Sequence, residues 1–252
     1  MKIALPIVVL VASAASCSPA AEKRPAAPTE GEGAVDVAVP QPGAAETDAP
    51  RTTEPAAEPD SATALLDPSL PQSSAPPEFR VRFETTKGNF DLRCVREWAP
   101  HGVDRFHHLV RIGFFRDVAL FRVVSGFVVQ FGIHGDPRVS AAWKEAKLPV
   151  DEVRHPNSAG TVSFAMSAEP TSRTTQVFIN LTDNSRLDSM GFAPICEVVG
   201  DGLTNTVSRF FSGYGEKATK TQARMQSEGN AFLRSEFPDL DYITNAYLLD
   251  TR

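Results

Sequence analysis

The sequence lacks the short motifs that mark common hydrolases and nucleotide-binding enzymes. It has no Gly-x-Ser-x-Gly segment, which would hold a nucleophilic serine, and no Gly-x-x-x-x-Gly-Lys-Ser/Thr loop, which would hold a phosphate. The five histidines are scattered, and the adjacent His107 and His108 would point to different faces of a helix, so the spacing typical of a zinc site is missing. Basic residues do not alternate with aromatic ones along any stripe. We therefore expect no metal site and no nucleic-acid partner.

Residues 18–78 contain no aromatic side chain, although they hold 12 of the 20 prolines. They carry 11 acidic and three basic residues, so the acidity of the chain (formal net charge −6) belongs to this segment and the remainder is close to neutral. A segment of this composition cannot bury enough apolar area to offset the entropy lost on folding. We expect residues 18–78 to form a disordered, partly extended tether.

The first 17 residues resemble an export signal. Residues 1–2 supply a short positive region, and the apolar run over residues 3–16 is shorter than the ~20 residues that a helix needs to cross a bilayer. The run ends in Ala-Ala-Ser-Cys, which resembles the lipobox of bacterial lipoproteins, although leucine is more usual at the place of Ala14. We expect a lipidated Cys17 and a periplasmic or outer-membrane-anchored protein of the cell envelope, which meets the membrane only through this lipid. An ordinary signal peptide that happens to end near a cysteine is the alternative.

All 16 phenylalanines lie beyond residue 78, which indicates one well-packed core in the last part of the chain. Periodicity predicts a helix that begins near Pro100 and ends at Gly113, and a loop over residues 133–157. Strands are expected at 79–83, 90–94, 120–132 (a pair), 160–165, 176–180 and 191–199, helices at 204–211 and 223–235, and a last apolar strip at 239–249. Many short strands with two flanking helices are typical of a closed barrel.

Cys94 and Cys196 remain as a pair if Cys17 is lipidated. Both lie in segments with a strand pattern, and an oxidising compartment would allow a disulfide between them. Two buried free thiols fit the sequence equally well, because the sequence does not give the Cα separation that a disulfide requires.

An arginine among apolar residues is the most informative feature of the chain. Arg122 stands in the apolar segment 121–132, together with Gln130. A buried, unpaired charge costs several kcal/mol, so the guanidinium needs a partner or a function. A salt bridge to an acidic neighbour is one explanation, and a role in a binding site is the other.

Three stretches carry a resemblance to a known family. Residues 121–130 read FRVVSGFVVQ, residues 162–165 and 175–179 read VSFA and TQVFI, and residues 187–188 and 197–199 read LD and EVV. In order and spacing they resemble the F-H-R-x-x-x-G-F-x-x-Q, S-M-A…S-Q-F-F-I and L-D-x…F-G-x-V segments of the cyclophilins, a family of peptidyl-prolyl cis–trans isomerases. The similarity covers residues 79–215.

The resemblance implies a mainly β fold with some α-helix: a closed, eight-stranded antiparallel barrel capped by two helices, with residues 216–252 as a C-terminal extension packed on it. It implies that Arg122 is the catalytic arginine, assisted by Gln130 and Phe127. The substrate-binding residues that it implies are Val128, Ala165, Gln176, Phe178, Leu187, Arg186 and Phe192.

The resemblance also implies an activity, the isomerisation of X–Pro bonds in proline-containing polypeptides, which needs no cofactor. With the export signal, it predicts a monomeric isomerase that assists the folding of exported proteins. The alternative is a non-catalytic, proline-binding chaperone or scaffold module of the cell envelope. Arg186 stands where many cyclophilins have a tryptophan that contributes to cyclosporin binding, which predicts weak cyclosporin sensitivity.

Overall fold

The computed structural model describes residues 61–249. The predicted export signal, the lipidation of Cys17 and residues 18–60 of the predicted tether lie outside these residues. Within residues 61–249, no helix combines the length and the apolar character needed to cross a bilayer.

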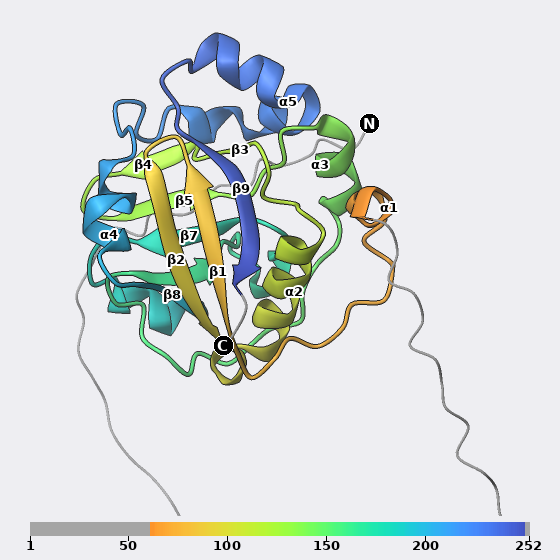
Figure 1. The fold of residues 1–252 in the computed structure, drawn as a ribbon, viewed down its shortest axis with the longest axis vertical. Helices are drawn as coiled ribbons and strands as arrows, with labels where there is room; N and C mark the ends of the chain where they lie inside the picture. The colour runs from red at the N-terminus through yellow and green to blue at the C-terminus, as the bar shows by residue number, and fades with distance from the viewer. Residues whose placement is uncertain (1–60, 250–252) are drawn as a thin grey trace, which may run out of the picture. The chain divides into compact units, whose positions relative to one another are not determined.

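One sheet forms the body of the described region (Figure 1). Its nine strands are β1 (Glu78–Thr85), β2 (Gly88–Val95), β3 (Val118–Ala119), β4 (Arg122–Val124), β5 (Val128–Phe131), β6 (Thr161–Phe164), β7 (Val177–Asn180), β8 (Pro194–Val199) and β9 (Tyr242–Leu249). They pair antiparallel in the order β3-β9-β1-β2-β8-β6-β7-β5-β4. The inward-facing side chains of these strands meet in the main apolar core.

The predicted closed barrel of eight strands is wrong in both number and closure. The sheet has nine strands, and its two edge strands, β3 and β4, do not pair with each other. They are separated in the chain only by Leu120 and Phe121, a connection that spans at most about 11 Å. The sheet is therefore curled, and its edges are held near each other by the chain rather than by hydrogen bonds.

The main helix lies where its periodicity predicts. Helix α2 (Pro100–Arg111) begins with proline in its first turn and ends before Gly113, whose φ of +73° suits a residue without a side chain. Its buried Val103, Phe106 and Leu109 join the main core. This helix packs against β8 and β9 of the sheet, and Figure 1 shows it beside β9.

The loop predicted over residues 133–157 is wrong in part, because it contains helix α3 (Pro137–Trp143). Asp136 caps this helix by accepting a hydrogen bond from the backbone N–H of Arg138, and Pro137 occupies its first turn. The helix predicted at 204–211 is instead two short turns, α4 (Gly202–Asn205) and η4 (Val207–Arg209). Three other short helical segments are η1 (Arg96–Trp98), η2 (Pro170–Ser172) and η3 (Ser185–Met190).

The prediction of a disordered tether up to residue 78 is wrong for residues 61–78. Helix α1 (Ser61–Leu66) places Ala64 in the core, and the indole N–H of Trp143 donates to the Leu65 carbonyl (2.9 Å). Further along, the N–H of Ala75 donates to the carboxylate of Asp104 in α2 (2.8 Å). Ala64 and Ala75 are small side chains that fill gaps in the main core, where no aromatic residue is needed. The composition of this segment therefore gives no sign that it packs on the fold.

Residues 210–241, here called the insert, run between η4 and β9 and build a second, smaller apolar cluster. It contains the short helix η5 (Ala218–Thr221) and helix α5 (Gln222–Glu236), which lies beside α3 (Figure 1). Members of the cluster are Ala119, Phe121, Ile133, Ala218, Met225, Phe232, Leu233, Leu240 and Tyr242. After the insert, β9 enters the sheet between β3 and β1, so the end of the chain is an integral strand rather than only a packed extension.

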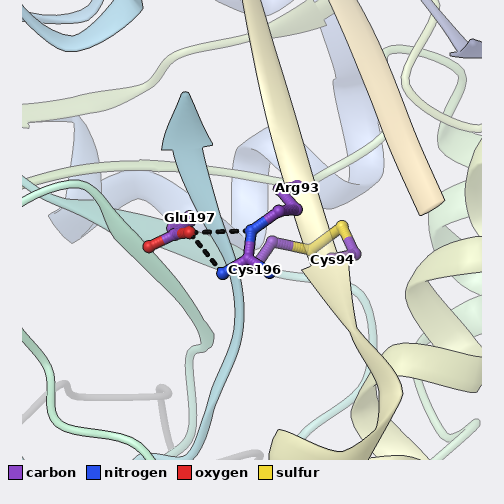
Figure 2. The surroundings of a disulfide bond; sticks show 4 residues. All are labelled: Arg93, Cys94, Cys196 and Glu197. Carbon is purple, nitrogen blue, oxygen red and sulfur yellow. Dashed lines mark hydrogen bonds and ion pairs between the residues drawn. A yellow bond between two sulfur atoms is a disulfide. The ribbon is translucent and has the colours of Figure 1, made fainter. Parts of the chain in front are cut away.

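A disulfide joins β2 to β8. Cys94 and Cys196 are directly opposite in the register of the two strands, and both are fully buried. Figure 2 shows the bond beside the neighbouring pair Arg93 and Glu197, whose side chains are linked by hydrogen bonds of 2.7 and 2.9 Å. The sequence fits either a disulfide or two buried free thiols, and the structure has the disulfide.

Candidate active site

Three polar side chains named from the sequence form a continuous hydrogen-bonded chain. Arg122 on β4 and Gln130 on β5 are direct partners in the register of the two strands. The Nη1 of Arg122 donates to Oε1 of Gln130 (2.9 Å), and Nε2 of Gln130 donates to Oε1 of Gln176 (2.9 Å). All three side chains are buried. The hairpin turn at residues 125–126 sets this register, so the local sequence is enough to bring Arg122 and Gln130 together.

The guanidinium of Arg122 also carries an ion pair that the resemblance does not imply. Its Nε and Nη2 donate to the two carboxylate oxygens of Glu216 in the insert, at 3.0 and 2.6 Å. The side chain of Arg122 is only 3% exposed, whereas that of Glu216 is 46% exposed. The salt bridge considered as the alternative explanation for Arg122 is therefore present, together with the hydrogen bond to Gln130.

An apolar cluster lies next to this polar chain. It consists of Val128, Met166, Phe178, Leu187 and Phe192, with Phe127 and Ala165 packed against it. The rings of Phe178 and Phe192 meet edge to face, with centroids 5.6 Å apart. The structure thus gathers all the apolar residues that the resemblance assigns to substrate binding, together with Phe127. Met166, which directly follows Ala165 in the chain, was missed.

Phe127 links the cluster to the arginine. The guanidinium carbon of Arg122 lies 5.5 Å from the centre of its ring, and that of the exposed Arg186 lies 4.9 Å away. The Phe127 carbonyl accepts hydrogen bonds from the N–H of Leu181 (2.9 Å) and the Nδ2 of Asn184 (3.1 Å). The ring is therefore carried on a fixed backbone and forms cation–π contacts with two arginines.

A buried asparagine holds the pocket segment η3 in place. The Nδ2 of Asn157 donates to Oδ1 of Asp188 and to the carbonyl of Phe192, both at 2.7 Å, and its Oδ1 accepts from the hydroxyl of Ser163 (2.8 Å). These bonds tie Leu187, one residue before Asp188, to β6. Sequence reasoning missed Asn157, because a single asparagine in a predicted loop gives no signal of its partners.

The polar chain continues from Gln176 into the insert. Nε2 of Gln176 donates to Oε1 of the buried Gln222 (3.2 Å), whose own Nε2 has no hydrogen-bond partner within residues 61–249. A small pocket of about 20 Å³ adjoins this chain, lined by Gln130, Ala165, Met166, Ser167, Ser172, Thr174 and Gln176. Amide groups at such a wall are suited to binding an extended peptide backbone. Within the described residues, no group of acidic, histidine or cysteine side chains is arranged to hold a metal ion.

Comparison with known proteins finds the same similarity in sequence and in fold. The family described as "Cyclophilin type peptidyl-prolyl cis-trans isomerase/CLD" matches residues 80–226. The chain is 34% identical to "Peptidyl-prolyl cis-trans isomerase A" of Dickeya dadantii over 134 residues, 51% of this chain and 70% of that protein. It is 31% identical to "Peptidyl-prolyl cis-trans isomerase B" of Escherichia coli over 130 residues, 49% of this chain and 79% of that protein. The crystal structure of a Cryptosporidium parvum cyclophilin type peptidyl-prolyl cis-trans isomerase shares the fold, with a TM-score of 0.51 and 17% identity over 69% of this chain and 99% of that chain.

Proposed function

Because the chain belongs to the cyclophilin-type peptidyl-prolyl cis–trans isomerase family, we propose that it isomerises X–Pro bonds in exported polypeptides and so assists their folding. The observation that carries the proposal is the hydrogen-bonded chain Arg122–Gln130–Gln176 beside the apolar cluster that contains Phe178. A cationic side chain beside an apolar surface that suits a pyrrolidine ring supports the proposal.

Isomerisation of an X–Pro bond is helped by a hydrogen-bond donor to the prolyl nitrogen and by an apolar surface that excludes water. Rotation about an X–Pro bond meets a barrier of about 18–20 kcal/mol because amide resonance is lost, while the two end states differ by only about 0.5–1 kcal/mol. A guanidinium that donates to the prolyl nitrogen favours the twisted, pyramidal form, and this bond is stronger where water is excluded. In this scheme Arg122 donates, Gln130 orients it, and the rings of Phe127 and Phe178 hold the proline. Tighter binding of the twisted state lowers the barrier without a covalent step or a cofactor.

The remaining residues would bind the polypeptide on either side of the proline. In our proposal Gln176 and Ala165 contact the substrate backbone along the pocket, and Arg186 forms an exposed rim above Phe127. Val128, Leu187 and Phe192 complete the apolar wall.

The cell envelope is the compartment that fits the sequence and the disulfide best. A buried Cys94–Cys196 bond is typical of proteins outside the reducing cytosol. The signal-like residues 1–17 support export, and Cys17 would supply a lipid anchor in the periplasm or at the outer membrane. We propose a monomer whose partners are unfolded, proline-containing proteins. Mass spectrometry of the mature N-terminus tests this: an acylated Cys17 supports the anchor, and an uncleaved Met1 contradicts export.

The alternative is a module that binds proline-containing segments with little turnover, as a chaperone or scaffold. One observation favours it: the guanidinium of Arg122 is covered and paired with Glu216 rather than open to a substrate. Binding would then depend on the apolar cluster and not on the arginine.

A proline-peptide isomerisation assay on the full chain separates the two functions. For the enzyme, Arg122→Ala should lower kcat/KM by about 10²- to 10³-fold, as expected when one transition-state donor is removed. Arg138→Ala, which removes an exposed arginine paired with Asp136, is the matched control and should keep the wild-type rate. Equal rates for Arg122→Ala and the wild type, with peptide binding retained, would support the binding module instead.

A further inference from the structure

We propose that the loop 212–217 of the insert is an inhibitory gate, and that Glu216 is its latch on the catalytic arginine. In the closed state shown by the structure, Glu216 occupies donors of Arg122 that a prolyl substrate would use. Catalysis then requires residues 215–217 of this loop to swing away. This inference rests on the proposed isomerase function and adds a restraint on that function from within the same chain.

The hydrogen bonds of Arg122 show how completely it is engaged. A guanidinium has five N–H donors in a planar fork. Two of them, on Nε and Nη2, go to the two oxygens of Glu216, and a third, on Nη1, goes to Gln130. Because the side chain is only 3% exposed, the two remaining donors do not face open solvent. A substrate therefore cannot reach the guanidinium unless one of its covering groups moves.

The loop that carries Glu216 is the cover best able to move. Every residue from 212 to 217 is exposed or half-exposed, whereas Phe210 before it and Ala218 after it are buried in separate apolar clusters. The loop contains Gly213 and Gly215, and Gly215 has a φ of +50°, so its backbone can change conformation at small steric cost. Within the loop, Tyr214 is held by edge-to-face contacts with Phe211 and Phe237 and by hydrogen bonds with Asp239. The part that moves is therefore residues 215–217, with Gly215 as its hinge, as in a short hinged lid.

The other groups around Arg122 are held more firmly. Gln130 lies in the interior of β5 with its amide bonded on both sides, and the carbonyl of Phe127 accepts two hydrogen bonds. Opening the gate would therefore leave the Arg122–Gln130–Gln176 chain intact. A substrate carbonyl or prolyl nitrogen can accept from the same donors that the Glu216 carboxylate releases, so substrate and latch compete for one position.

Removal of the latch carboxylate tests the gate. Glu216→Gln keeps the size of the side chain but loses the charge and one acceptor. It should raise kcat/KM for a neutral proline peptide by about tenfold, which corresponds to about 1.4 kcal/mol. The control is Glu228→Gln, which breaks an equivalent two-pronged pair with Arg224 on α5 of the same insert and should leave the rate unchanged. Thermal melts of both variants check that the fold is kept.

Ionic strength gives a second measurement that needs no variant. The half-exposed Glu216 pair is weakened by salt, so the wild-type rate on a neutral peptide should rise with ionic strength, while the rate of Glu216→Gln should change much less. A Glu216→Gln enzyme that is slower than the wild type would mean that Glu216 positions Arg122, and would overturn the gate; so would equal rates. If neither the wild type nor Glu216→Gln isomerises or binds a proline peptide, the proposed function itself fails.

Discussion

Removal of the disulfide should destabilise the protein by several kcal/mol. The bond links residues 102 positions apart, and in the chain-entropy account a loop of about 100 residues contributes about 4.7 kcal/mol at 25 °C. Measured losses for native disulfides of small secreted domains are typically about 2–5 kcal/mol. For a chain of this size, each kcal/mol shifts Tm by about 2–4 °C. We therefore expect the double variant Cys94→Ala/Cys196→Ala to melt roughly 10–20 °C below the wild type.

Urea unfolding of the reduced wild type and of the double variant separates two causes of the lost stability: the freer unfolded chain and the packing defect in the core. Both should be made in a Cys17→Ala background, so that no third thiol can exchange with the pair. If the bond acts on the unfolded state, its removal lets the unfolded chain expand, and the m-value should increase as well. If the free energy of unfolding falls by less than about 1 kcal/mol and the m-value is unchanged, the entropic reasoning is refuted, since a loop of this length should contribute several kcal/mol. The reduced wild type keeps both sulfur atoms in the core, whereas the double variant loses them. The double variant should therefore be less stable than the reduced wild type only by the cost of this packing defect.

Three further outcomes follow from single positions. Burial lowers the pKa of His107 and His108 below the usual value near 6.5. As the pH decreases through about 6.5, the unfolded chain therefore binds protons before the folded chain does, and Tm should fall. A Tm that stays constant between pH 8 and 5 would contradict this. Gly132→Ala should lower the free energy of unfolding in urea by at least about 2 kcal/mol, because the φ of Gly132 is +106° and a Cβ would press on the Thr175 carbonyl oxygen. A smaller loss would mean that the segment around Thr175 shifts freely. Cyclosporin should inhibit the wild type weakly and Arg186→Trp more strongly, and a nanomolar inhibition constant for the wild type would disprove the role given to this rim residue.

The pocket could be predicted because three stretches of the sequence resemble the cyclophilins, and four of its residues, Arg122, Val128, Gln130 and Phe178, lie on strands whose patterns are local. Arg122 and Gln130 face each other across a hairpin whose turn is marked by Ser125-Gly126, and one residue of register error would send their side chains to opposite faces. Phe178 then follows from the pairing of the next strand with β5. In this part of the chain, the spacing of the motifs and the pairing of the strands both predict that Arg122, Gln130 and Phe178 lie side by side.

The partners supplied by irregular segments could not be predicted in the same way. Glu216 lies 94 residues from Arg122, in a polar loop with no periodicity, and nothing in its neighbourhood distinguishes it from a solvated surface glutamate. Asn157 and helix α1 present the same difficulty, since their contacts are long-range and their composition is that of loops. The Asp136-Pro137 start of α3 was a readable signal, because it combines an N-cap with a first-turn proline, but the short helix gave too little apolar periodicity to stand out.

The strength of the latch sets how far a gate of this kind can restrain an enzyme. Exposed ion pairs contribute about 0.2–1 kcal/mol, and hydrogen bonds to charged groups about 1.5–3 kcal/mol; a pair with one buried and one half-exposed partner lies between these limits. Closure is therefore favoured by a factor of about ten, and the apparent affinity for substrate falls by the same factor, because only the open fraction binds. The cost of opening is paid before any contact with the substrate. The ratio of Glu216→Gln to wild-type kcat/KM should then be the same for peptides with different residues before proline, whereas a latch that also contacted the substrate would give a ratio that varies with that residue.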